Sequence, residues 1–241
     1  MALSNYSELV ESISVWLDGS DLGGRAADMI ALCEDEINAR LAAGIEAGAF
    51  IRPMAVRGSL TIDGEYVDLP DGEMIRPISI EISGLDAPWE VRFVTPERLI
   101  AMKPDEETAR VAIELMAGAA VPRFYTVIGE QLRFFPAPGQ GFTAEFTRFA
   151  RVPTLSDEAG SNWVLAGHRN AYLYGTLAQA ELFGWNDARV ANLAGLFAQA
   201  VDGIIGRYPA PVDRSALSSE VALIGDNRGA PTLSAFLAGS L

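Results

Sequence analysis

Several residue types that support catalysis or metal binding are nearly absent from this chain. Among its 241 residues, Cys33, His168 and Lys103 are the only cysteine, histidine and lysine. A single cysteine excludes an intramolecular disulfide and a cysteine-based zinc site. A Ser-His-Asp relay would have to pass through His168, but no Gly-x-Ser-x-Gly elbow is present. We therefore expect His168 to be a surface or capping residue and Cys33, on an apolar helix face, to be a buried thiol.

Signals for membranes, cofactors and phosphate binding are missing as well. No apolar run approaches the roughly 18 residues that cross a bilayer, and no basic leader with an apolar stretch behind it occurs. Neither standard glycine-rich phosphate loop is present. We expect a soluble protein that acts in a cytoplasm with no cofactor, no metal and no membrane partner.

Positive charge is also scarce. The formal net charge is -14, from 18 basic and 32 acidic residues. This balance argues against a surface that grips nucleic acid, because phosphate neutralisation requires clustered Lys and Arg. Residues 1–51 hold nine acids and two arginines, a balance of -7 and half of the chain's total.

Helical periodicity dominates the N-terminal part. It predicts a helix from Ser4 to Leu17, where Asn5 and Glu8 fit a capping box. A longer helix is expected from Asp21 to about Gly48. Opposite its apolar stripe, three aspartates recur at seven-residue spacing: Asp21, Asp28 and Asp35. The neighbouring acids Glu34, Asp35 and Glu36 point in different directions round the helix, so they cannot converge on one metal ion.

Alternating apolar residues replace the helical period from Arg52 onward. Strands are expected at 56–62, 65–69, 74–83, 89–94, 123–128, 131–135 and 142–149. Asp63 and Gly64 predict a two-residue hairpin that joins the first two strands. Thr95, Pro96 and Glu97 predict a short helix that ends near residue 102. Residues 103–120 are ambiguous: their charged start is typical of a loop, whereas Val111–Met116 fit either a strand or a helical turn.

The longest helical period lies in residues 162–208. Its first helix carries an apolar face from Tyr172 to Phe183, and Gly184 is suited to end it. Asn186 is suited to cap a second helix, whose apolar face runs from Val190 to Ile205. Because the connection is so short, the two helices are expected to form an antiparallel hairpin.

These segments predict an α+β fold. An antiparallel helical bundle is expected from residues 1–51 together with 151–208, with an inserted antiparallel β-rich domain at 52–150. Residues 209–241 read as an extended tail, rich in Pro, Gly, Ser and Ala. Its apolar segments favour docking on another surface over disorder. They contain Val221, Ala222, Leu223, Ile224, Leu233, Phe236 and Leu237.

Three stretches together resemble a known protein family. They are the helical start from Tyr6 through Arg40, with Trp16–Leu22 and the helix sequence at Ile30–Leu41, then the strand pair at Pro122–Pro138, and the helix that contains Asn162–Leu165 and Tyr172–Ala180. In this order they are similar to the head-to-tail adaptor, or head-completion, proteins of tailed bacteriophages. The likeness is strongest to the adaptor and tail-tube-A-like proteins of short-tailed phages. It covers about residues 3–206. The family often has His-Pro-Asp where this chain has His168, Arg169 and Asn170.

The resemblance implies a structural virion protein of the phage neck, assembled in the host cytoplasm. It implies a ring, commonly of twelve copies, between the portal protein and a tail or nozzle protein, through which the genome passes without specific binding. An acidic wall suits that passage because it repels phosphate. Asp21, Asp28 and Asp35 are then expected to line the channel or to contact arginines of a neighbouring copy; a solvated helix face is the alternative.

Two other function classes stay open at this point. One is a carbohydrate-acting hydrolase, for which a deep pocket with two carboxylates about 5 to 9.5 Å apart is the distinguishing feature. The other is a β adhesion or ligand-binding module carried on a helical scaffold.

Overall fold

The computed structural model describes residues 3–16, 25–69, 74–85, 89–117, 120–183 and 187–211. Within these ranges the chain is a mixed α+β protein with seven α-helices, two short 3₁₀ turns and one seven-stranded sheet. In chain order the elements are α1 (Tyr6–Trp16), α2 (Ala26–Glu46), η2 (Arg52–Met54), β1 (Ala55–Ile62), β2 (Tyr66–Asp68), β3 (Met74–Ile82), β4 (Trp89–Phe93), α3 (Pro96–Met102), η3 (Lys103–Asp105), α4 (Glu106–Ala117), β5 (Phe124–Ile128), β6 (Gln131–Phe135), β7 (Phe142–Ala150), α5 (Trp163–Gly167), α6 (Arg169–Phe183) and α7 (Asp187–Ile205).

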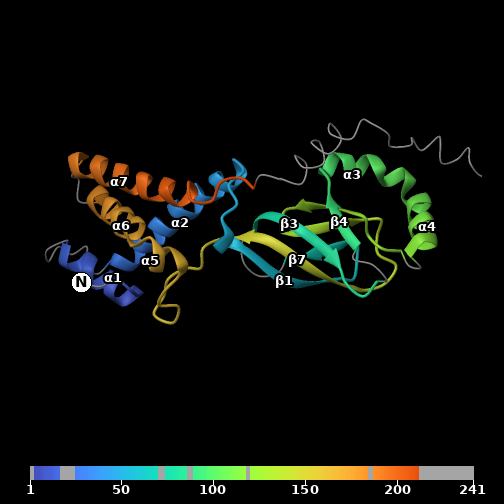
Figure 1. Ribbon diagram of the computed structural model, residues 1–241, viewed down its shortest axis with the longest axis horizontal. Coiled ribbons are helices and arrows are strands. Elements are labelled where there is room, and N and C mark those ends of the chain that lie inside the picture. The colour runs from blue at the N-terminus through green and yellow to red at the C-terminus, as the bar shows by residue number, and fades with distance from the viewer. Residues whose placement is uncertain are drawn as a thin grey trace, which may run out of the picture.

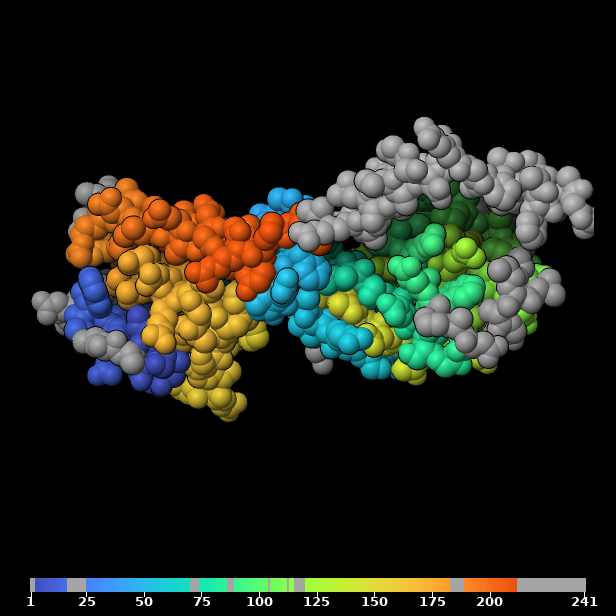
Figure 2. Space-filling view, in the orientation of Figure 1, coloured from blue at the N-terminus to red at the C-terminus, as the bar shows by residue number. Residues whose placement is uncertain are grey.

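The molecule is elongated, with helices at one end and the sheet at the other (Figure 1). The helices α1, α2, α5, α6 and α7 gather at one end, while α3 and α4 accompany the strands. The two ends meet around η2, the light-blue segment in Figure 2. Phe149 of β7 and Met54 of η2 belong to the same buried cluster as the helical side chains, so the two ends share apolar packing.

The capping expected at α1 is present in a modified form. The side chain of Asn5 accepts the Glu8 amide at 2.8 Å, as an N-cap residue should. The Glu8 carboxylate reaches back one residue further than a capping box requires and accepts the Ser4 amide at 2.7 Å. The Ser4 and Glu8 amides, which lie at or just before the start of α1 and have no backbone partner within the helix, are therefore satisfied by side chains.

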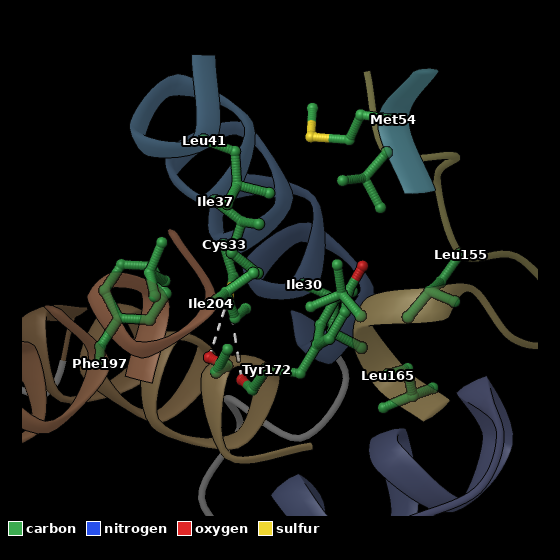
Figure 3. Close-up of a cluster of buried hydrophobic side chains, with 14 of the residues drawn as sticks. Ile30, Cys33, Ile37, Leu41, Met54, Leu155, Leu165, Tyr172, Phe197 and Ile204 are labelled. Carbon is green, nitrogen blue, oxygen red and sulfur yellow. Dashed lines mark hydrogen bonds between the residues drawn. The ribbon is translucent and has the colours of Figure 1, made fainter. Parts of the chain in front are cut away.

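The helical core is built from the apolar faces predicted in α2 and α7. Ile30, Cys33, Ile37 and Leu41 of α2 are buried, and Figure 3 shows them beside Phe197 and Ile204 of α7. Gly175 of α6 permits the close approach, because a Cβ there would lie 2.8 Å from a ring carbon of Phe197 and would overlap the Cys33 sulfur. A side chain at position 175 would have to push α6 away from both neighbours.

The strands form one curled sheet in the order β1-β7-β3-β4-β5-β6-β2. The predicted hairpin between β1 and β2 is wrong. All of β1 pairs with β7, from Ala55 opposite Phe149 to Ile62 opposite Phe142, and β2 pairs with β6. A tight hairpin turn needs positive φ at its central residues, and Gly64 does not adopt it. Because only residues 63–65 connect β1 to β2, the sheet must curl to bring its two outer strands together.

The sheet is not wholly antiparallel, which corrects a second expectation. The β4 and β5 strands run parallel, with Arg92 opposite Phe124 and Phe93 opposite Tyr125. Parallel neighbours need a long crossover rather than a tight turn. The crossover consists of α3, η3 and α4. The charged start of the segment is therefore helical rather than a loop, and Val111–Met116 are helical rather than a strand. Strands that follow each other closely do form antiparallel pairs elsewhere: β3 with β4, and β5 with β6 around Gly129 at φ 62.

The helical run of residues 162–208 is interrupted near its start. Asn162 caps α5 by accepting the Leu165 amide, and α5 ends at Gly167. His168, at φ -139 and ψ 51, leaves the helical conformation before α6 begins at Arg169. This break between α5 and α6 occurs although the chain has Arg169 where the resembling family often has proline. The link between α6 and α7, which contains Gly184 and Asn186, lies outside the described residues.

Candidate functional site

The acidic face of α2 is the site that the sequence predicted most specifically. Asp28 and Asp35 are exposed, and Leu32, also exposed, lies between them on the same face. Asp35 forms an ion pair of 3.6 Å with Arg151 of its own chain. Asp21 lies outside the described residues. The structure thus places two of the three aspartates on an accessible surface and gives one of them a partner within the chain.

Glu34, next to Asp35 in sequence, points the other way. It is buried, and its Oε1 accepts hydrogen bonds from the Leu155 amide at 2.8 Å and the Tyr172 hydroxyl at 3.0 Å. Burial raises the pKa of the Glu34 carboxyl, and these two hydrogen bonds oppose the shift because they favour the charged form. Burial likewise raises the pKa of Tyr172. The Tyr172 hydroxyl therefore keeps its proton near neutral pH and donates a hydrogen bond to Glu34.

Two asparagines extend this network to the segment that leads from the sheet back to the helices. Asn38 accepts the Val152 amide at 2.8 Å. Asn162 donates to the Pro153 carbonyl at 2.8 Å and to the Tyr172 hydroxyl at 2.6 Å. The segment after β7 has no regular structure of its own, so these side chains satisfy its buried backbone groups. The network fixes the path of residues 151–162 across α2.

A hollow of about 610 Å³ lies between α2, the ends of β1 and β7, and this segment. Its polar lining side chains include Glu34, Asp35, Asn38, Arg148, Arg151 and Thr154. Two carboxylates in one hollow are one part of the feature named above for a glycoside hydrolase. Glu34, however, is committed to structural hydrogen bonds, and Asp35 pairs with Arg151. Both carboxylates therefore contact other groups of the same chain and help to position the segment that follows β7.

Cys33 and His168, each the only residue of its type in the sequence, both contribute to packing or to helix ends. Cys33 is buried, its thiol faces the Ala171 and Tyr172 carbonyls at 3.9 and 3.8 Å, and burial raises its pKa to about 12. The prediction of a buried thiol is confirmed. His168 is the C-cap residue of α5 and packs edge to face against Trp163 with ring centroids 6.3 Å apart. It acts as the capping residue that was expected.

Within the described ranges, no three His, Cys, Asp or Glu side chains lie close enough together to hold a metal ion. In the same ranges, none of the helices combines the length and the apolar character that a membrane span requires.

Comparison with known proteins decides the family. A family model described as SU10 adaptor protein matches residues 4–221 of the chain. The chain belongs to the SU10 adaptor protein family. A search of curated proteins found no match. The resemblance to phage head-to-tail adaptors is thereby confirmed, and the match extends beyond the expected limit at residue 206 into the tail.

Membership of the SU10 adaptor family gives this chain a structural role in a bacteriophage. It implies contact with portal and tail proteins and a place in the neck of the virion. The remaining predicted contact residues of this adaptor lie outside the described residues. They are Val221, Ala222, Leu223, Ile224, Leu233, Phe236 and Leu237. The chain is described up to Pro211. Just before that point the Tyr208 carbonyl accepts the Phe50 amide at 3.1 Å.

Sequence reasoning missed the buried network of this SU10 adaptor. Its signal was present, because Glu34 and Asn38 interrupt the apolar stripe of α2 four residues apart. Polar residues at buried helix positions require hydrogen-bond partners. The sequence shows that such partners must exist, but it does not show that they come from residues 152–172.

Proposed function

We propose that this protein forms a ring, of twelve copies as in the resembling family, that joins the portal to the tail or nozzle and lets the genome pass. The family match over residues 4–221 carries this proposal. The net charge of -14 supports it, because a conduit for DNA should repel phosphate rather than retain it. DNA is therefore cargo that passes without specific binding.

The proposal assigns a part to each region. Residues 1–51 and 151–208 form an antiparallel helical bundle, residues 52–150 an inserted β-rich domain, and residues 209–241 a docking tail. Two separate buried clusters support the first division. One is formed mostly by the helices at one end, and the other by side chains of the sheet such as Ile80, Tyr125 and Phe146. Separate cores allow the two parts to contact different partners.

Exposed apolar side chains at the helical end favour an interaction role. Trp16 of α1 is 58% exposed and Leu182 of α6 is 60% exposed. Side chains of this kind usually lie in interfaces when they occur together on a surface. Trp16 lines a hollow together with Leu177 and Leu193, so the helical end offers an apolar contact surface for another subunit or for the portal.

Electron microscopy of the purified protein, alone and mixed with its portal, tests the proposal. We expect added ring density on the portal, with a central opening wide enough for duplex DNA. Class averages that show bare portals at saturating concentrations of this protein would contradict it. Hydrolysis of a polysaccharide by the protein alone would instead favour the enzyme alternative.

A further inference from the structure

A positively charged pocket lies at the junction of α5, α6 and the end of α7. Its volume is about 390 Å³, and its polar side chains are His168, Arg169, Asn170 and Arg207. Ala166 and Ala200 contribute apolar walls. No acidic residue lines this pocket in the described part of the chain. We call it the arginine pocket. It is a concentration of positive charge in a protein whose net charge is -14.

The two guanidinium groups of the arginine pocket are available to a ligand. Arg169 and Arg207 are exposed, and no ion pair engages either of them within the described residues. Their field acts inside the pocket: after partial burial, Arg207 is the second cause that lowers the pKa of His168. A pocket with two such groups and no acid is suited to a carboxylate, which arginine binds through paired hydrogen bonds.

A complementary surface is present elsewhere on the same chain. On the exposed face of α2, Asp28 and Asp35 flank Leu32, which is 44% exposed. Asp35 is engaged by Arg151, whereas Asp28 has no ion-pair partner among the described residues. This face therefore presents one free carboxylate beside an accessible apolar side chain.

We infer that Asp28 of one copy enters the arginine pocket of the next copy in the ring and binds between Arg169 and Arg207. The inference rests on the proposed ring and names the contact that holds neighbouring copies together. Leu32 packs against the alanine walls of the pocket in this arrangement.

A ring explains why one chain carries both surfaces. In a cyclic assembly each subunit meets its neighbours through two different patches, so a surface and its complement must occur on every copy.

Nucleic acid is the other anionic ligand that the arginine pocket could bind in a phage neck. The acidic face of α2 and the overall charge disfavour it, because they repel phosphate over distances longer than the pocket itself.

Charge reversal tests the contact in the full chain mixed with its portal. Asp28→Arg and Arg207→Glu should each lower ring occupancy on the portal by about tenfold or more, because like charges then face each other. The double variant carries both reversed patches on every copy, so it should restore occupancy close to that of the wild type. Glu114→Arg on α4 and Arg98→Glu on α3 are matched controls, since both sites are exposed and carry the same charge changes.

His168 supplies an independent readout because it is the only histidine. Exchange of its C2 hydrogen, followed by mass spectrometry across a pH series, reports its pKa in both the free and the assembled protein. A carboxylate in the pocket favours the charged imidazole, so the pKa of His168 should rise on assembly. It should not rise in any assembled Asp28→Arg protein.

Each outcome separates the contact from the wider proposal. Wild-type protein that forms no ring on the portal would overturn the proposed function and this contact with it. Rings that tolerate both single reversals, or a double variant that stays as defective as the singles, would overturn the contact alone. If Arg207→Glu protein forms normal rings but no longer retains duplex DNA, the pocket binds phosphate rather than a carboxylate of the neighbouring copy.

Discussion

The Tyr172 hydroxyl lies 3.0 Å from Oε1 of Glu34, which joins α6 to α2 across 138 sequence positions. The same hydroxyl accepts a hydrogen bond from Asn162 at 2.6 Å. A single side chain thus connects two helices and the segment that returns from the sheet. The orientation of the helical end relative to residues 151–162 depends on this group.

Tyr172→Phe should lower the free energy of unfolding by about 1–3 kcal/mol, because it removes a partner from two buried polar side chains. The ring is retained, so the loss is specific to the hydroxyl. Urea denaturation followed by circular dichroism measures it. Tyr66→Phe is the matched control, since Tyr66 is 47% exposed and its loss should stay within about 0.5 kcal/mol. Equal losses at the two sites would contradict the assigned role of Tyr172.

Glu34→Gln should change how stability depends on pH. The raised pKa of Glu34 in the folded protein means that the unfolded chain loses this proton first as pH rises. Protonated Glu34 therefore contributes fully to the free energy of unfolding below the ordinary glutamate pKa of about 4.3. This contribution is lost as pH rises through the pKa of Glu34 in the folded protein. Glutamine keeps a hydrogen-bond acceptor and cannot ionise.

The stability of Glu34→Gln relative to the wild type should consequently increase as pH rises from about 4 to neutrality. Denaturant titrations at several pH values measure this difference. Asp28→Asn is the control with the same change of charge at an exposed site. A difference between Glu34→Gln and wild type that is flat with pH would show that Glu34 is not held in a burial-dominated environment.

Gly175→Ala should destabilise the protein by about 1–3 kcal/mol, because the new methyl group overlaps Cys33 and Phe197. Gly195→Ala makes the same substitution in α7, where nothing lies within 4 Å of the added carbon. It should stabilise the protein by up to about 1 kcal/mol through helix propensity. Thermal unfolding of the two variants should therefore shift in opposite directions. A shift in the same direction would place Gly175 on an open face.

The thiol of Cys33 should be inert in the folded protein. It is buried and its pKa is raised to about 12, so the reactive thiolate is scarce near neutral pH. Ellman's reagent at pH 8 should label the protein only as fast as it unfolds, and at once in concentrated urea. Because the chain has one cysteine, the signal needs no further assignment. Labelling that is fast and independent of added denaturant would contradict the buried position.

A stop after Tyr208 should leave a folded protein that no longer stays on the portal. The backbone contact between Phe50 and Tyr208 is retained, and so is the helical core. The removed residues include the apolar segments at 221–224 and 233–237, which need a preformed surface to offset the cost of ordering them. Co-sedimentation with the portal measures binding, and circular dichroism checks the fold. Wild-type binding by the truncated protein would remove the docking role of the tail.

Local sequence patterns predicted most of the individual elements. The apolar period of α2 and α7, the capping by Asn5, and the strands β3 to β7 all depend on neighbours within a few residues. Gly129 and Glu130 connect β5 to β6 in the same local way, because a glycine supplies the positive φ of the turn. The exposure of Asp28 and Asp35 followed from the same helical period.

Strand partners were beyond the reach of such patterns. Asp63-Gly64 has the composition of a hairpin turn, but β1 pairs with β7, which is some eighty residues away in sequence. Alternation predicts that a strand exists and which face is buried, whereas its neighbour is chosen by packing of the whole sheet. The helical state of residues 106–117 follows only once β4 and β5 are known to be parallel.

The sequence by itself determined the acidic charge, the family, and which residues form most helices and strands, because composition and periodicity are local properties. Only the tertiary structure decided that Glu34 points inward to Tyr172 while Asp35 faces Arg151. Only it brought Arg169 and Arg207 into one pocket. The physical reason is that a hydrogen bond or a pocket requires partners to meet in space, and residues 34 and 172 or 169 and 207 become neighbours only after the helices have packed.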